Sequence, residues 1–75
     1  MNQEPRIWVL ETDNYHEGYK TRLFSTKESA VKYVVNNYDL CQAEQRKLHL
    51  GGYAEIRDSR DNPSTFEIYL EEVIK

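Results

Sequence analysis

Few residues of this 75-residue chain belong to the types that staple or anchor a small protein. Cys41 has no second cysteine with which to form an internal disulfide, which favours a reducing compartment. The first residues have neither the basic start nor the long apolar run of a secretory signal, so we expect a cytoplasmic protein. No apolar stretch approaches the roughly 20 residues that cross a bilayer, so we expect no membrane contact.

The residue types that perform nucleophilic catalysis or bind metals are also scarce and scattered. His16, Cys41 and His49 fall in separate segments, and their spacing matches no zinc-binding signature. Cys41 lies in phase with an apolar helical stripe, where a cysteine acts as a small hydrophobic residue. We therefore expect no catalytic residue, no metal site and no cofactor, and we interpret Cys41 as part of the core.

The net charge of −3 comes entirely from the last third of the chain. Residues 1–50 hold seven basic and seven acidic residues, whereas residues 51–75 hold three basic and six acidic ones. Nucleic-acid binding needs a basic stripe that releases counterions from phosphates, and the sequence has none. The charge therefore disfavours nucleic acid and favours a basic protein partner. Two close carboxylate pairs are interpreted as solvated charge, namely Glu71–Glu72 and Asp58–Asp61.

Four segments have the β-branched and aromatic residues, or the alternation, that are typical of strands. We predict strands at residues 6–12, 19–24, 53–58 and 65–72. The first has apolar side chains on both faces, so it should be a central strand. Its faces are Ile7 with Val9 and Trp8 with Leu10. The short turn segment at 13–18 favours an antiparallel hairpin with the second strand.

A helix is predicted over about residues 26–37. Ser25 and Glu28 form a capping-box pattern, in which the Ser25 hydroxyl accepts a hydrogen bond from the Glu28 N–H. The apolar residues that follow recur at helical spacing. They are Val31, Val34, Val35 and Tyr38.

A second helix is predicted over about residues 40–49. Asp39 is a candidate cap at its start, and Gly51 is a stop signal at its end. Asn36 and Asn37 favour a break before it, whereas the apolar stripe continues in phase across them. The pattern is therefore consistent with one long helix or with two short ones.

The predicted order is β-β-α-β-β within a single domain that spans residues 1–75. We expect an α+β fold, with a four-stranded, mainly antiparallel sheet and one long or two short helices on one face. Phe66, Ile68 and Leu70 should face the helical layer. The opposite face of the sheet is then open, and the pattern leaves the order of the strands undetermined.

Tyrosine is abundant, with six residues in the chain. Tyr53 and Tyr69 should lie on the open face beside Glu55, Glu67 and Glu71. We predict these five residues as a binding surface for a protein partner or for a second copy, since aromatic anchors in a charged rim are typical of interfaces. An apolar pair from the first strand is expected to join them. Packing of the tyrosines against their neighbours on the sheet is the structural alternative.

The segment 23–30, Leu-Phe-Ser-Thr-Lys-Glu-Ser-Ala, follows a strand pair and opens a helix. With Ile7-Trp8-Val9-Leu10 before it and the stretch 66–72 after it, the chain resembles a group of small phage and bacterial β-β-α-β-β proteins of unknown function. The resemblance implies the fold and a phage or prophage setting. Small acidic phage proteins are often inhibitors of host nucleases or defence complexes, which is the activity that the resemblance suggests.

Three classes of function follow from these observations. The first is a non-enzymatic protein-binding module, in the form of a phage accessory protein that inhibits a host protein. The second is a homodimeric structural or regulatory domain, since a dimer would also bury an open face. A small enzyme and a nucleic-acid binder rank last, because the sequence supplies interface residues and withholds both a catalytic constellation and a basic patch.

Overall fold

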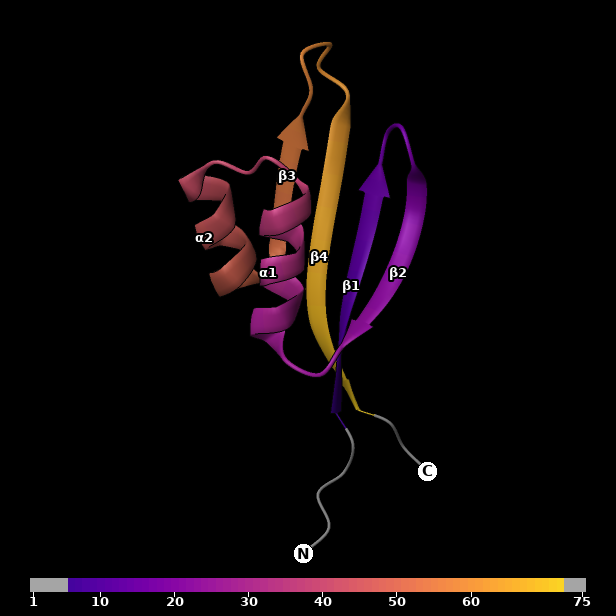
Figure 1. Ribbon diagram of the computed structural model, residues 1–75, viewed down its shortest axis with the longest axis vertical. Coiled ribbons are helices and arrows are strands. Elements are labelled where there is room, and N and C mark those ends of the chain that lie inside the picture. The colour runs from indigo at the N-terminus through magenta and orange to yellow at the C-terminus, as the bar shows by residue number, and fades with distance from the viewer. Residues whose placement is uncertain (1–5, 73–75) are drawn as a thin grey trace, which may run out of the picture.

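The computed structural model describes residues 6–72, which form an α+β fold of four strands and two helices (Figure 1). The elements are β1 (Arg6–Asn14), β2 (Gly18–Phe24), α1 (Lys27–Asn37), α2 (Gln42–Gly51), β3 (Tyr53–Arg57) and β4 (Pro63–Glu72). The four strands make one antiparallel sheet in the order β2-β1-β4-β3. The predicted four-stranded antiparallel sheet with helices on one face is therefore confirmed, and the helices are two short ones.

Two hairpins, β1–β2 and β3–β4, are joined through their inner strands. β1 pairs with β4 along its whole length, so these two strands form the centre of the sheet. β2 and β3 are the two edges. Because both hairpins run the same way, their tips lie together at the end of the sheet that is remote from Arg6 and Glu72 (Figure 1). This arrangement confirms that the first strand is central.

The core lies between the sheet and the two helices. α1 packs across the sheet, and α2 packs beside it against β3 (Figure 1). The buried core residues are Leu10, Ala30, Val34, Leu40, Leu48, Ala54, Phe66 and Ile68. Leu70 faces the same side as Phe66 and Ile68 but remains exposed, because β4 extends past the helical layer there. Neither helix of the described part is long and apolar enough to span a membrane.

The cap of α1 lies one residue later than the sequence pattern predicts. Thr26, and not Ser25, is the N-cap, and its Oγ1 accepts a hydrogen bond from the N–H of Ser29 at 3.1 Å. The predicted Ser25–Glu28 capping box is therefore wrong. Both frames place a hydroxyl three residues before a polar residue, so the sequence pattern does not distinguish them.

The two helices are separated by an extended segment around Tyr38. The backbone of Tyr38 is extended, with φ −135° and ψ 150°, and Leu40 is buried in the core. This change of direction moves Cys41 out of the apolar stripe, so Cys41 is exposed and the expectation of a core cysteine is wrong. Cys41, rather than Asp39, is the N-cap of α2. Gly51 is the last residue of this helix, and Gly52 is its left-handed C-cap.

Candidate functional site

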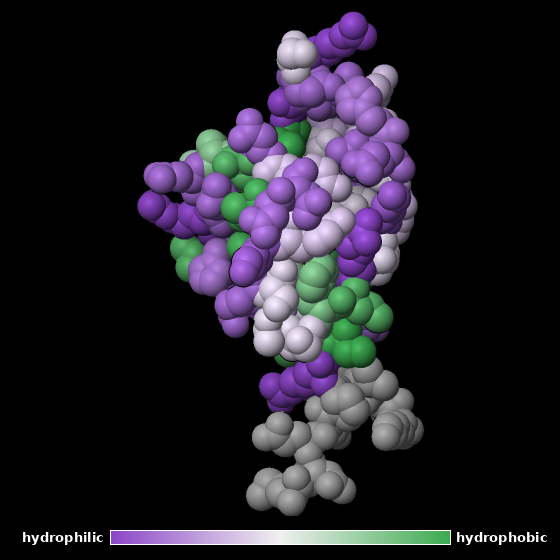
Figure 2. Space-filling view, in the orientation of Figure 1, coloured by the Kyte–Doolittle hydropathy of each residue, from purple (hydrophilic) through white to green (hydrophobic). Residues whose placement is uncertain are grey.

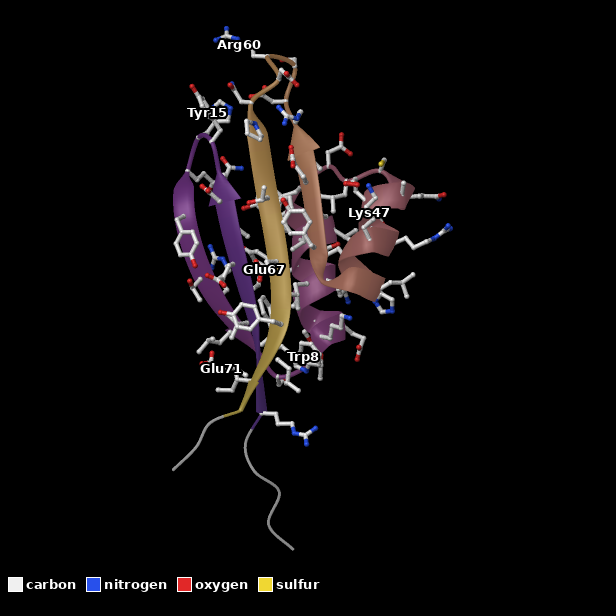
Figure 3. The ribbon with its side chains drawn as sticks, turned by 180° about the vertical axis from the view of Figure 1, so that it is seen from behind. Trp8, Tyr15, Lys47, Arg60, Glu67 and Glu71 are labelled. Atoms are coloured by element: carbon white, nitrogen blue, oxygen red, sulfur yellow. The ribbon has the colours of Figure 1, made fainter. Side chains whose placement is uncertain are left out.

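The sheet face opposite the helices carries all five residues of the predicted binding surface. In antiparallel ladders, directly paired residues share a face. Pairing of Tyr53 with Glu67 and of Val9 with Tyr69 places Tyr53, Glu67 and Tyr69 together on the face that no helix covers. Figure 3 looks onto this side, with Glu67 and Glu71 on β4. We call this surface the acid–aromatic face and define it by Glu11, Tyr53, Glu55, Glu67, Tyr69 and Glu71.

Two tyrosine rings flank Glu67 on the acid–aromatic face. Tyr53 is its direct partner on β3, and Tyr69 is two residues further along β4. The exposed fractions of Tyr53 and Tyr69 are 48% and 37%. Both rings therefore present a large amphipathic surface to solvent at a low cost in conformational entropy, which is the property of an interface anchor.

The acid–aromatic face has a strong excess of negative charge. Glu11 on β1 is the direct partner of Glu67 on β4, so two carboxylates occupy opposing positions of the ladder. Like charges in this position destabilise a sheet. Glu55 pairs with Arg57 at the β3 edge, with 2.9 Å between Arg57 Nη2 and Glu55 Oε2. The potential in the middle of the face is consequently negative.

The carboxylates of this face change the pKa of the Tyr69 hydroxyl. A hydrogen bond with the Glu11 carboxylate raises the pKa of Tyr69 above 10.0, and the neighbouring Glu71 and Glu67 add to the rise. The hydroxyl is therefore protonated over the physiological range and acts as a donor.

The apolar pair of β1 lies on the open face as expected, but Ile7 is half-buried and Val9 is buried. Val9 lies on the same face as Tyr69 and Leu23, its direct partners on β4 and β2. Its exposed fraction is only 2%, because side chains of the sheet already cover it. Packing of Tyr69 against its neighbour on the sheet, the structural alternative, therefore describes the contact of Tyr69 with Val9. The exposed apolar surface comes instead from the tyrosine rings and from Leu23.

The residues with nucleophile or ligand character do not come together. His16 lies in the β1–β2 turn, Cys41 at the start of α2 and His49 near its end. Within residues 6–72, no group of three or more His, Cys, Asp or Glu side chains could hold a metal ion. This finding does not test catalytic activity, so the absence of a catalytic site stays a prediction.

His16 does have a partner, which the sequence pattern did not reveal. Its Nε2 lies 2.9 Å from Oδ2 of Asp58, in the loop between β3 and β4. The pair links the tips of the two hairpins, where Figure 3 shows Arg60 at the β3–β4 tip and Tyr15 at the β1–β2 tip. The two residues are 42 positions apart, so their contact depends on the strand order.

Asp58 also organises its own loop. Its carboxylate accepts hydrogen bonds from the backbone N–H groups of Arg60 and Asn62 and from the side chain of Asn62. The bond from the Asn62 backbone and the bond with His16 are the main causes that hold the pKa of Asp58 well below 3.8. The interpretation of Asp58 as merely solvated charge is therefore wrong, because this carboxylate has a defined structural role.

Two shallow depressions lie between α2 and β3 and share Lys47 and Tyr53 in their lining. Glu44 lines the first depression. Its Oε2 lies 3.2 Å from Lys47 Nζ, and its Oε1 accepts a hydrogen bond from the backbone N–H of Glu55 at 3.5 Å. Lys47 lies beyond the β3 edge, as Figure 3 shows. These contacts satisfy polar groups of the first depression and help to hold α2 on the sheet edge, at the seam between α2 and β3. The second depression is lined by other residues of α2, including the exposed Leu50, together with Lys47 and Tyr53. Tyr53 belongs to both this seam and the acid–aromatic face.

Comparison of the chain with protein-family models, with curated proteins and with solved structures finds no match. The function must consequently be argued from the acid–aromatic face itself.

Proposed function

We propose that this chain is a non-enzymatic protein-binding module and that its acid–aromatic face binds a basic protein. The observation that carries the proposal is the direct opposition of Glu11 and Glu67 between two exposed tyrosines. Opposed carboxylates cost stability, and such costs are expected where function requires them. A cationic side chain from a partner would remove this repulsion on binding.

The exposed tyrosines of the face supply the anchors of the proposed interface. Binding energy concentrates in a few aromatic or arginine anchors that are surrounded by a polar rim. A tyrosine has few rotatable side-chain bonds, so little conformational freedom is lost when a partner covers the ring of Tyr69. The carboxylates around it would accelerate the approach of a basic partner and would make the association rate sensitive to salt.

A homodimer through the same face is the weaker alternative. Two copies placed face to face would bring Glu11, Glu67 and Glu71 of one against the carboxylates of the other. Arg57 already pairs with Glu55 at the sheet edge and lies away from this acidic centre. Charge complementarity therefore favours a different, basic protein over a second copy.

The acidic character of the face also indicates which basic surfaces it fits. A nuclease or another nucleic-acid-binding protein has a basic surface that contacts phosphates. A face with opposed carboxylates and stacking rings is complementary to such a surface and would compete with the nucleic acid. Inhibition of a host nuclease or defence protein, the activity suggested by the resemblance, is therefore the specific form of the proposal.

A capture experiment with matched variants tests the proposal. The tagged chain is used to capture proteins from lysates, and quantitative mass spectrometry compares it with a face variant (Glu67→Lys with Tyr69→Ala) and a control variant (Asp39→Lys with Tyr15→Ala). Asp39 and Tyr15 are exposed and lie outside the acid–aromatic face. Each variant replaces one carboxylate with lysine and one tyrosine with alanine, so the two have the same change in net charge.

The proposal predicts that the wild type and the control capture the same basic protein and that the face variant loses it. Each anchor that is removed should weaken binding about tenfold or more. If the protein recovered is a nuclease, a stoichiometric amount of the chain should inhibit it. Equal capture by the face variant, after its fold has been checked, would contradict the proposal.

A further inference from the structure

Within residues 6–72, one edge of the sheet, β3, is covered by a helix, whereas the other edge, β2, is not. At the β3 edge, α2 packs alongside the strand, and the Glu44 carboxylate accepts a hydrogen bond from the outward N–H of Glu55 at 3.5 Å. At the β2 edge, no other element of residues 6–72 lies beyond the strand (Figure 1). An uncovered edge presents backbone donors and acceptors that can pair with another strand.

β2 combines this uncovered edge with two chemically distinct sides. Its residues from Gly18 to Leu23 are exposed. Lys20 and Arg22 lie on the helix side, and Tyr19 and Leu23 lie on the other side. From the helix side, hydrophilic side chains run along the outer part of the β1–β2 hairpin and give way to an apolar patch where β2 ends (Figure 2). A strand that added to this edge would meet cations on one side and apolar groups on the other.

The two cations of β2 are held in place near the edge. The guanidinium carbon of Arg22 lies 4.9 Å from the centre of the Tyr33 ring. The ammonium group of Lys20 lies 3.8 Å from the Glu17 carboxylate, at a separation where solvent screens much of the attraction. Both side chains are exposed, so they can pair with anions from outside.

A second copy of the chain is a poor occupant of this edge. Antiparallel pairing of two β2 strands about Thr21 would place Lys20 of one copy opposite Arg22 of the other. Like charges in directly opposed positions are destabilising, and charged residues on edge strands are a common protection against self-pairing. The same charges attract a strand that carries carboxylates at alternate positions.

We propose that the β2 edge binds an extended acidic segment of another protein by strand addition. The backbone of the segment pairs with β2, its alternate carboxylates face Lys20 and Arg22, and its intervening apolar side chains contact Tyr19 and Leu23. In this mode the main-chain hydrogen bonds provide affinity and the alternating side chains provide specificity. This inference concerns a different surface from the acid–aromatic face and does not depend on the function proposed for it.

Nuclear magnetic resonance of the full ¹⁵N-labelled chain tests the inference with four synthetic peptides. The probe is acetyl-Thr-Glu-Val-Glu-Val-Glu-Thr-amide. The second peptide replaces each Glu with Lys. The other two keep the side chains of the probe but have N-methyl groups on alternate amides, so that each version blocks the N–H donors of one strand edge. The N-methyl versions separate backbone pairing from a purely electrostatic attraction, since only backbone pairing requires those N–H donors.

We expect the acidic probe to shift the amide signals of β2 and to slow hydrogen exchange at its alternate amides. The lysine peptide and one of the N-methyl versions should bind about tenfold more weakly or not at all. A Lys20→Glu/Arg22→Glu variant should lose the acidic probe and gain the lysine peptide. The control Lys32→Glu/Arg46→Glu has the same charge change on exposed helix positions and should bind as the wild type does.

Three results would overturn the inference. The first is the absence of shifts at β2 at millimolar probe concentrations. The second is equal binding of the acidic probe, the lysine peptide and both N-methyl versions. The third is concentration-dependent dimerisation of the wild type in sedimentation experiments that the Lys20→Glu/Arg22→Glu variant alters, because the occupant of the edge would then be a second copy.

Discussion

Glu11 on β1 and Glu67 on β4 are direct partners in the central ladder of the sheet, so two carboxylates oppose each other on the open face. Opposed like charges lower the stability of the folded state. Glu67→Gln should therefore raise the free energy of unfolding by about 0.2–1 kcal/mol at neutral pH and low salt. Urea midpoints measure the change, and Asp39→Asn is the control with the same loss of charge at an exposed loop position. An equal gain in both variants would show that net charge alone is responsible.

The observed cap of α1 gives a second prediction. Thr26→Ala should lower the free energy of unfolding by about 1 kcal/mol, because the Ser29 N–H loses its acceptor. Ser25→Ala should change it by less than about 0.5 kcal/mol, as expected for an exposed residue without a role in capping. Thermal or urea unfolding of the two variants distinguishes the frames, and a larger cost at Ser25 would restore the capping box expected from sequence.

Adjacent glycines at the end of α2 should respond to substitution with opposite signs. Gly52 has φ +73°, and a Cβ atom there would approach the carbonyl oxygen of Ile68 to 2.5 Å. Gly52→Ala should therefore destabilise the fold by more than about 1 kcal/mol. A Cβ at Gly51 meets nothing within 4 Å, so Gly51→Ala should be neutral or stabilise the helix by up to about 1 kcal/mol. Comparable urea midpoints for the two variants would contradict this account.

The link between the hairpin tips predicts a particular pH dependence. The folded-state pKa of Asp58 is lowered, so its contribution to stability is present above the ordinary value of 3.8 and is lost as the pH falls below it. Asp58→Asn should reduce stability at pH 7 and should flatten the decline between about pH 4 and pH 2. Chemical unfolding across this range measures the effect. A decline as steep as that of the wild type would exclude Asp58 as its source.

The pattern of the sequence predicted those features that depend on local periodicity. Strand alternation has a period of two, so it correctly placed Tyr53, Tyr69 and Glu67 on one face and Phe66 and Ile68 on the other. The prediction was wrong at the start of α1, where two adjacent residues of similar chemistry are both candidate caps. Two successive hydroxyl residues, Ser25 and Thr26, could both cap α1, and the structure shows the cap at Thr26.

Features that depend on the order of the strands could not be predicted from the sequence pattern. Backbone hydrogen bonds are the same for every residue type, so the pattern does not specify which strands become neighbours. The opposition of Glu11 and Glu67 and the contact of His16 with Asp58 both follow from the pairing of β1 with β4. The exposed position of Cys41 follows from the turn at Tyr38, which interrupts an apolar stripe that remains in phase in the sequence.

The central claim, that the acid–aromatic face binds a basic protein, is tested most directly by fluorine resonance of the six tyrosines. The chain is produced with 3-fluorotyrosine, its six signals are assigned by single Tyr→Phe replacements, and the basic protein recovered by capture is added. Our account predicts that the signals of Tyr53 and Tyr69 shift or broaden in proportion to complex formation, whereas that of Tyr15 at the hairpin tip does not change. A response of Tyr15 alone, with Tyr53 and Tyr69 unaffected, would contradict the account and would place the working surface at the hairpin tips.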